Sequence, residues 1–239
     1  TIEHPTYLPD EVAAATDFDA GKANGRIYRI TAASEYRPAT LKASTPKTLV
    51  EALGHPNGWH RDTAQRLLLE NMDLDVIPLL EKSLHLATSP QAHALSLHLL
   101  NAADALTPVH LLGALRDDSA GIREQGLRLA RELGESSPEL RAAIIQRAND
   151  PDENVRFACA LVLGDTASPR SDTLLALSSI LKKDIDDPWV QVVVLSALGN
   201  AASAFSEQLL QEEPTGENGW LDFMEGLSRI IALSESPES

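Results

Sequence analysis

From residue 45 onward, apolar residues recur at the three- and four-residue spacing of an α-helix, and five segments align with one another without gaps. The aligned segments are residues 59–68, 91–100, 121–130, 154–163 and 189–198. Three positions after the third residue of each stands a small or medium side chain: Ala64, Ser96, Gly126, Cys159 and Val194. An aliphatic pair follows, and it ends at Leu68, Leu100, Ala130, Leu163 and Leu198. These positions share one helical face, so each segment is predicted to be a helix packed closely against its neighbours.

A second amphipathic stretch precedes each aligned segment, which makes every unit a helical hairpin. These stretches are residues 46–54, 74–87, 108–116, 138–149 and 171–184. The hairpins recur every 30–35 residues, within the range of α-helical repeat proteins. A final pair, at about 204–212 and 218–233, is predicted to form a degenerate cap. The pattern therefore predicts an all-α fold, an α-α superhelix of about five hairpins stacked in a right-handed sense.

The predicted helix starts share one chemical form, a small polar residue followed by proline. They are Thr45-Pro46, Ser89-Pro90, Thr107-Pro108, Ser137-Pro138, Asp150-Pro151 and Asp187-Pro188. The polar side chain accepts a hydrogen bond from a first-turn N–H, and proline at the next position gives up a donor that has no partner there. Glycines are expected to end second helices in a left-handed conformation, at Gly134, Gly164 and Gly199.

Residues 1–43 do not follow the helical pattern. Residues 25–30, GRIYRI, alternate in the manner of a β-strand, and a single strand needs a partner. Residues 1–43 are therefore interpreted as the end of a preceding domain plus a linker, and residues 44–239 as the solenoid, with 204–239 as its cap. The first residue falls within a loop-like stretch, which is typical of a fragment of a larger protein.

The stretch from Asp150 to Arg156, DPDENVR, resembles the HEAT-repeat pattern, in which Asp-Pro occupies the turn inside the repeat and Val-Arg opens the second helix. The stretch from Asp187 to Gln191 is similar with Gln in place of Arg, and residues 118–123 are similar without the proline. The resemblance covers about residues 45–203 and makes the predicted superhelix a HEAT-like solenoid. It implies that the Asp and Arg side chains bond between neighbouring repeats.

A closer resemblance covers about residues 20–80. Residues 25–30 together with residues 49–68, LVEALGHPNGWHRDTAQRLL, look like a family of large multidomain proteins from planctomycete-type bacteria. Those proteins resemble a sugar-dehydrogenase-like β-propeller, a HEAT-repeat segment and a c-type haem domain, in that order. The resemblance implies an exported, periplasmic or cell-surface parent protein of the dehydrogenase type. The chain contains only the last strand of such a propeller and no Cys-x-x-Cys-His motif, so the chain itself is expected to be non-enzymatic and without a cofactor.

Composition narrows the class of partner. Hydrophobic residues make up 43% of the chain and aromatic residues only 4%, which favours closely stacked helices over a sheet sandwich. The formal net charge is −15, so nucleic-acid binding is not expected, and a protein with a cationic face or a flanking domain of the same chain is the natural partner. No apolar stretch approaches the roughly 20 residues that span a bilayer, so membrane insertion is not expected. The sequence gives no signal for an oligomeric state.

The candidate binding residues each admit two interpretations. Trp59 and Trp189 either form an aromatic binding surface or pack at the helix entrance, and packing is favoured. Arg61, Arg123 and Arg156 are interpreted mainly as a ladder that joins neighbouring repeats through the acids of the turns, and otherwise as a recognition stripe on a partner-binding concave surface. That candidate surface comprises Trp59, Arg61, His93, Arg123, Arg156, Trp189 and Gln191.

No catalytic or metal site is predicted. Five histidines fall in the first two hairpins, but neither His55 with His60 nor His93 with His98 has the i, i+4 spacing of a zinc-binding helix. The only cysteine, Cys159, stands at a position expected to be buried, where a thiol is inert. The acids at 184, 186 and 187 are interpreted as a solvated loop rather than a cation site.

Three functions remain open at this point. The first is a protein-binding scaffold, which is favoured because helical repeats display an extended surface. The second is a passive spacer between domains. The third is a HEAT-type enzyme that acts on a cationic substrate bound in an acidic groove.

Overall fold

The structure, a computed structural model, describes residues 7–18, 45–86, 89–131, 133, 137–164, 170–210 and 218–234. The chain divides into two units, residues 1–40 and residues 41–239. In the first unit, the described residues form one short helix, α1 (Asp10–Ala14), which buries no side chain. The strand predicted at residues 25–30 lies outside the described residues, and those that are described contain no strand.

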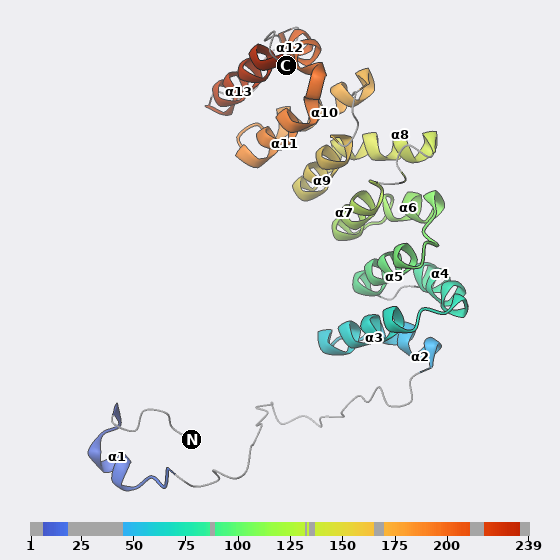
Figure 1. Cartoon of the computed structure of the whole chain (residues 1–239), viewed down its shortest axis with the longest axis vertical. Helices are drawn as coiled ribbons and strands as arrows, with labels where there is room; N and C mark the ends of the chain where they lie inside the picture. The colour runs from blue at the N-terminus through green and yellow to red at the C-terminus, as the bar shows by residue number, and fades with distance from the viewer. Residues whose placement is uncertain are drawn as a thin grey trace. The chain divides into compact units, whose positions relative to one another are not determined.

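Within the described residues, the second unit contains six helical hairpins (Figure 1). The first helix of each, here called an A helix, is α2 (Pro46–Ala52), α4 (Ile77–Leu86), α6 (Pro108–Ala114), α8 (Pro138–Gln146), α10 (Ser171–Lys183) or α12 (Ala202–Leu210). The second, the B helix, is α3 (Gly58–Glu70), α5 (Pro90–Ala102), α7 (Ala120–Leu129), α9 (Glu153–Leu163), α11 (Pro188–Leu198) or α13 (Asn218–Ser234). Short 3-10 turns, η2 (Leu74–Val76), η3 (Arg147–Asn149) and η4 (Gly199–Ala201), adjoin α4, α8 and α11. The predicted all-α fold of stacked hairpins is confirmed.

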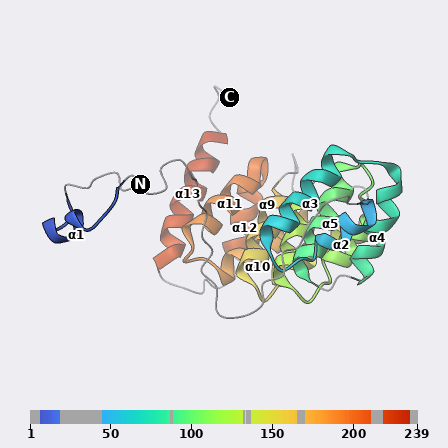
Figure 2. The same ribbon diagram turned by 90° about the horizontal axis from the view of Figure 1, so that it is seen from below.

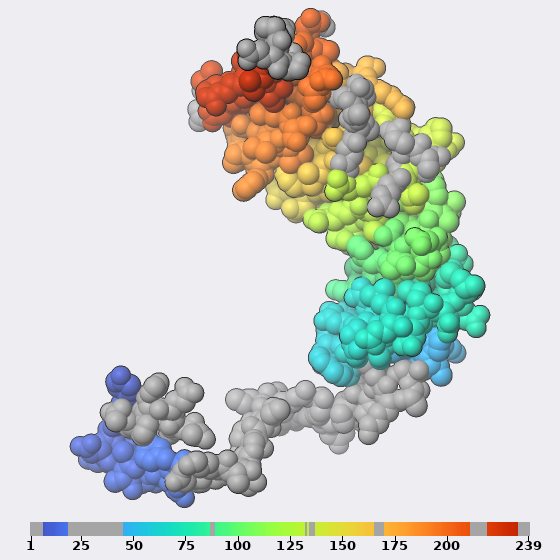
Figure 3. Space-filling view, viewed as in Figure 1, coloured from blue at the N-terminus to red at the C-terminus, as the bar shows by residue number. Residues whose placement is uncertain are grey.

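The two kinds of helix form two layers of the stack. The B helices contact one another in succession, from α3 through α5, α7, α9 and α11 to α13. Seen along the stack, the later hairpins are displaced sideways from the first ones (Figure 2). The layer of B helices lines the side of this unit that is hollowed between its ends (Figure 3).

Most of the predicted helix starts are confirmed by their caps. The side-chain oxygens of Ser89, Ser137 and Asp187 accept hydrogen bonds from backbone N–H groups two or three residues further on, at 3.2, 3.2 and 2.8 Å. Thr45 and Thr48 cap each other reciprocally at the start of α2. Each of these caps satisfies donors that the first helical turn leaves without a partner.

The cap predicted at Asp150 is wrong. Helix α9 begins three residues later, at Glu153, and its cap is Asp152, whose Oδ1 accepts from the backbone N–H groups of Asn154 and Val155. The carboxylate of Asp150 is not free to cap the helix because arginine side chains occupy it, as described below.

The aliphatic seam is present from the first hairpin to the last. The five predicted end positions are all 4% exposed or less, and the five small-residue positions are buried as well. Buried residues form one group in α2–α5 and another from α6 to α13, with a small group of Leu97, Ala114 and Ile122 between them. Leu106 packs against all three groups. The fold is therefore held together by burial between neighbouring hairpins, as the repeat predicts.

Two glycines at the ends of B helices have different roles, and the prediction holds for only one. Gly199 has a φ of 48°, in the left-handed region that glycine tolerates best. Gly164 has a φ of −77°, which any residue adopts. Its hydrogen faces the next hairpin instead, because a Cβ there would lie 2.9 Å from the Cβ of Ala197. Gly134 lies outside the described residues.

The last hairpin continues the core. Phe205 of α12 and Phe223 of α13 are fully buried and meet edge to face, with ring centroids 6.4 Å apart. Among the described residues, Pro188–Leu210 is one segment long and apolar enough to span a membrane by length and composition, contrary to the sequence expectation. It runs through α11, η4 and α12, and its residues Val194, Leu198 and Phe205 are buried in the core, which accounts for its composition.

Candidate interaction surface on the B helices

In the later hairpins, the third residue of an aligned segment joins its own turn to the turn of the next hairpin. In α7, the Arg123 guanidinium donates from Nε and Nη2 to the two oxygens of Asp150, at 2.8 and 2.7 Å. Its Nη1 donates to the backbone carbonyls of Asp117 and Asp118, both at 3.0 Å. One side chain therefore closes the turn before α7 and holds the turn before α9.

Asp150 is 2% exposed, so its charge is stabilised by partners rather than by water. Arg147 donates to its Oδ2 at 3.0 Å and the backbone N–H of Asp152 to its Oδ1 at 3.1 Å, in addition to the pair with Arg123. Burial on its own raises the pKa of Asp150. The hydrogen bonds from Arg123 and from Asp152, together with the charges of Arg123 and Arg147, outweigh burial and hold the pKa below its usual value.

Arg156 repeats the arrangement one hairpin later. Its Nε donates to Oδ2 of Asp184 at 2.6 Å, and its Nη2 to Oδ1 of the same carboxylate. Its Nη1 donates to the carbonyls of Asp150 and Pro151, at 2.9 and 3.1 Å. In the next hairpin, the uncharged Gln191 stands at the position of the arginines. Its Nε2 donates to the carbonyls of Ile185 and Gly219. The predicted ladder of arginines bonded to turn acids is confirmed at Arg123 and Arg156, and Gln191 forms a further link that uses carbonyls only.

In the first hairpin the ladder prediction is wrong, and in the second the link to the next turn is weaker. Arg61 donates from Nη1 to the carbonyls of His55 and Pro56, which belong to its own turn, at 2.7 and 3.0 Å. The turn that leads to α5 contains no acid that corresponds to Asp150. His93 contacts Asp117 of the next turn, with 3.1 Å between Nδ1 of the histidine and Oδ2 of the carboxylate.

The position of the ladder agrees with a comparison of the sequence with known families. Residues 108–199 match HEAT repeats. The HEAT-repeat segment thus spans α6 to α11, the three hairpins that contain the links from Arg123 to Asp150 and from Arg156 to Asp184. A search of curated proteins found no match to the chain.

Trp59 and Trp189 are exposed, so the favoured prediction that they pack at the helix entrance is wrong. Each is the second residue of its helix, and each is largely in water, at 64% and 71% exposure. The buried face begins one residue later, at His60 and Val190. A side chain in the first turn, one residue before the buried face, points outward. Of these two tryptophans, only Trp59 has a ring contact among the described residues, edge to face with His60.

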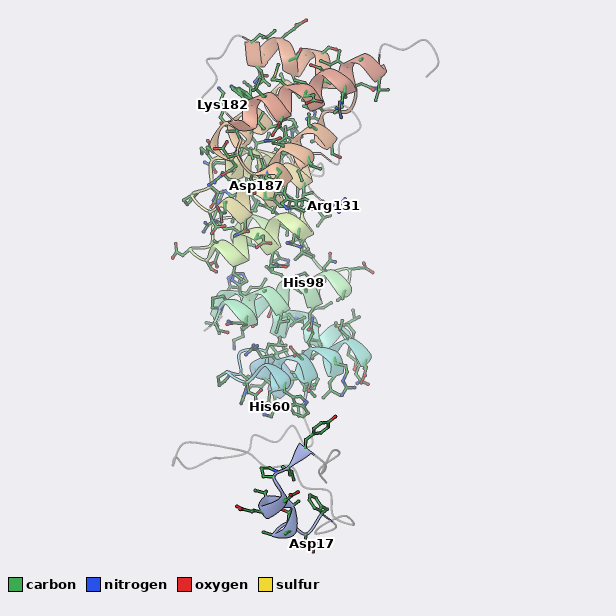
Figure 4. All side chains as sticks on the ribbon, turned by 90° about the vertical axis from the view of Figure 1, so that its left-hand side faces the viewer. Asp17, His60, His98, Arg131, Lys182 and Asp187 are labelled. Atoms are coloured by element: carbon green, nitrogen blue, oxygen red, sulfur yellow. The ribbon has the colours of Figure 1, made fainter. Side chains whose placement is uncertain are left out.

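The outward face of the B helices changes character along the stack. In the fourth and eighth positions of the aligned segments, the first three hairpins have Asp62, Arg66, Ala94, His98, Glu124 and Arg128. The same positions of α9 and α11 hold Phe157, Leu161, Val192 and Ser196. Figure 4 looks onto this face, and His98 of α5, which hydrogen-bonds Gln125 of α7 at 2.9 Å, is labelled in its polar part.

The apolar face, as we call it, comprises Phe157, Leu161, Trp189, Val192 and Leu221. Leu161, Val192 and Leu221 are 44%, 57% and 75% exposed, and Phe157 is partly buried. The face crosses the three successive B helices α9, α11 and α13. The sequence predicted only Trp189 of these residues, although the fourth aligned position changes from Asp62, Ala94 and Glu124 to the large apolar Phe157 and Val192.

A pocket of about 420 Å³ opens at the edge of the apolar face, between the N-terminal ends of α9 and α11. Phe157, Trp189 and Val190 provide its apolar lining. Its polar lining consists of Glu153, Asn154, Lys183, Asp184, Asp186 and Asp187. Asp187 is labelled on this face in Figure 4. We call this cavity the α9–α11 pocket.

The remaining reactive side chains have structural surroundings. Among the described residues, no group of three or more His, Cys, Asp and Glu side chains is placed to hold a metal ion. Cys159 is fully buried, its Sγ donates to the carbonyl of Ile144 at 3.2 Å, and burial raises the pKa of the thiol far above its usual value. A thiol in this state is protonated and unreactive.

The predicted surface residues therefore fall into two groups. Arg123 and Gln191 are buried, while Arg61, His93 and Arg156 are partly buried and bonded to turns, so these five mainly hold the hairpins together. Trp59 and Trp189 are accessible. Of these two, Trp189 lies on the apolar face and lines the pocket.

Proposed function

We propose that the second unit is a non-catalytic scaffold that binds a protein on the apolar face. HEAT repeats are helical scaffolds or interaction modules and typically mediate protein interactions. The proposal is carried by the exposure of Leu161, Trp189 and Val192 on two adjacent B helices of the HEAT-repeat segment. Exposed apolar side chains gathered on one face, with tryptophan among them, are typical of protein-binding surfaces.

The two other candidate functions fit the surface less well. A passive spacer gains nothing from exposed apolar residues, which lower solubility. An enzyme needs a nucleophile or a proton shuttle beside its substrate. The described residues that line the α9–α11 pocket include no serine, cysteine or histidine. This lining favours a binding role over a catalytic one.

We further infer that the scaffold belongs to a longer exported protein of the dehydrogenase type. The inference is supported by the resemblance of residues 25–30 and 49–68 to the multidomain family named above. The complete reading frame tests it. A β-propeller before residue 1 and a Cys-x-x-Cys-His motif after residue 239 are expected, and a reading frame without either would overturn the inference.

The apolar face is tested by site-specific photocrosslinking in cells that produce the protein. A benzophenone amino acid replaces Val192 on the apolar face or, as a matched control, Val109 on α6, which is 74% exposed in the layer of A helices. A protein captured at position 192 and not at 109 is then purified, and its affinity is measured by calorimetry. Val192→Asp should weaken that affinity at least about tenfold, because a charge replaces a desolvated apolar contact, and Val109→Asp should leave it unchanged.

Two results would contradict the scaffold proposal. Equal capture at positions 192 and 109 would mean that the apolar face is not preferred. An affinity for the purified partner that is insensitive to Val192→Asp would place the binding site elsewhere.

A further inference from the structure

We propose that the α9–α11 pocket takes an arginine or lysine side chain of the protein that binds the apolar face. This inference rests on the proposed function and adds the chemical class of the partner, a segment in which a basic residue adjoins an apolar one.

The two aromatic side chains of the pocket come from different hairpins. Phe157 is on α9 and partly buried, while Trp189 is on α11 and 71% exposed. A cation over the face of an indole ring is attracted by the electron density of the ring, and tryptophan is the best of the aromatic residues in this role. An exposed tryptophan beside a cavity therefore offers a surface that a long cationic side chain can cover with its methylene groups and its charge.

The charges around the pocket complement such a side chain. Four carboxylates line it, from Glu153, Asp184, Asp186 and Asp187, and Lys183 is the one cation among its lining residues. Glu153, Asp186 and Asp187 are exposed, so an approaching cationic side chain can reach their carboxylates. A net charge of −15 for the whole chain acts in the same direction and speeds the approach of a basic partner.

The bonds that these groups already make leave room for a cationic donor. Asp184 is neutralised by Arg156, whereas Asp187 and Asp186 each accept a backbone N–H, from Trp189 at 2.8 Å and from Gly219 at 3.3 Å. A carboxylate has about four acceptor sites on two oxygens, so one such bond does not saturate it. Lys183 does not compete strongly, because its Nζ donates to Asn149 Oδ1 at 3.0 Å.

An organic cation fits the pocket better than a metal ion does. Calcium takes six to eight oxygen ligands at close range, and no described group of acids and histidines is placed to provide such a set. The aromatic and aliphatic side chains of the lining offer contacts that a metal ion cannot use. Val192 lies one helical turn after Trp189, so an apolar neighbour of the basic residue would contact the apolar face.

The experiment uses ¹⁹F NMR of the full chain labelled with 5-fluorotryptophan. The three tryptophans are Trp59, Trp189 and Trp220, and single replacements by phenylalanine assign their signals. The probe is the capped peptide Ala-Leu-Arg-Ala-Leu-Arg-Ala, and its control has citrulline in place of both arginines, which keeps the shape and removes the charge. Trp59 is the internal control, because it stands at the equivalent helical position and is 64% exposed without lining this pocket.

The arginine peptide should shift the Trp189 signal saturably, and the citrulline peptide should not. Trp189→Ala should raise the Kd for the arginine peptide about fivefold or more through loss of the aromatic contact. Glu153→Gln should raise it about threefold, and Lys183→Gln should lower it by a similar factor through removal of the like charge. None of these three changes touches the aliphatic seam, so circular dichroism should stay unchanged.

Two outcomes would overturn the inference. In one, both peptides shift Trp189 equally, so that the pocket does not recognise charge. In the other, neither peptide produces a saturable shift at Trp189, or Trp59 responds in the same way. In both cases the apolar face is judged separately by the crosslinking at Val192, so failure of the cation site and failure of the scaffold proposal are distinguishable.

Discussion

The hairpins α2–α5 and the hairpins α6–α11 are built from the same kind of helix pair and share one aliphatic seam. They differ in the bonds that join each hairpin to the next. In the earlier pair, Arg61 bonds only to its own turn and His93 makes one contact with the next. In the later hairpins, Arg123 and Arg156 each hold the acid of the next turn with two hydrogen bonds. Burial of the seam is therefore enough to stack hairpins. The Arg–Asp ladder is an additional set of bonds, and it occurs in the part of the chain that matches HEAT repeats.

The same division appears on the outward face of the B helices. At the fourth and eighth aligned positions it is mostly polar over α3, α5 and α7, and mostly apolar over α9 and α11. Because hairpins in a repeat stack contact only their neighbours, the two regions can differ in stability as well as in surface. We expect the first two hairpins to open more readily than the HEAT-repeat segment.

The largest expected effect comes from a charge in the seam of the later region. Leu163→Asp places an unpaired carboxylate where the side chain is 4% exposed, and it should cost about 4 kcal/mol or more. Hydrogen exchange should lose protection in α8–α11 while α2–α5 stay protected. Leu68→Asp, at the equivalent position of α3, is the matched control and should reverse this pattern. Uniform loss of protection in both variants would mean that the regions fold as one cooperative unit.

Removal of one ladder arginine should have the next largest effect, and its size should depend on the region. Arg123→Ala leaves the buried Asp150 with Arg147 as its remaining cation, and it should destabilise the protein by about 3 kcal/mol. Arg61→Ala removes only hydrogen bonds to backbone carbonyls and should cost about 1 kcal/mol. Urea unfolding measures both. Equal losses would contradict the difference between the two regions.

The sequence was sufficient to predict the stack and much of the ladder. Helical spacing places Leu68 and Leu163 at matching buried positions. Periodicity is a property of a whole segment, so one atypical residue does not change the helix that it predicts. The ladder followed from the resemblance of residues 150–156 to the HEAT pattern. The role of Asp150 was predicted only in part, because an Asp before Pro fits a helix cap as well as an ion pair.

The surface was harder to predict than the core. The sequence around Trp189 is compatible with a packed or an exposed side chain. Consecutive residues of a helix point about 100° apart, so a shift of one residue moves a side chain from the buried face to the solvent. The pocket depends on how α9 and α11 pack against each other. At their C-terminal ends the approach is fixed by Gly164 against Ala197, two residues that carry no chemical signal of their own. Such approach distances arise from tertiary packing and are not readable from one segment.

A methyl group at Gly164 should therefore have a moderate effect. A Cβ at this residue would lie 2.9 Å from the Cβ of Ala197, so Gly164→Ala should force the two hairpins apart and cost about 1–2 kcal/mol. In the first hairpin, the residue equivalent to Gly164 is Leu69, which is 47% exposed. The first and second hairpins therefore pack less closely at this position. Gly113→Ala in α6 is the control. No atom lies within 4 Å of its added Cβ, and it should stabilise the protein by about 0.5–1 kcal/mol. Thermal unfolding measures both, and a stabilising Gly164→Ala would mean that the close approach is not maintained.

The smallest expected effect is the part of the pH dependence that comes from Asp150 in the later region. The pKa of Asp150 is lowered in the fold, so its ionised form stabilises the protein above the unfolded pKa of about 3.9, and that stabilisation is lost as the pH falls through the folded pKa. Arg61 bonds to carbonyls, which do not titrate in this range. Urea unfolding followed by ¹⁹F signals of Trp189 and Trp59 should therefore give midpoints that converge as the pH is lowered from about 6 to 3. Asp150→Asn should remove part of this convergence, because the amide cannot ionise. If the Trp59 midpoint fell as steeply as the Trp189 midpoint, the ladder would not be the source of the difference between the two regions.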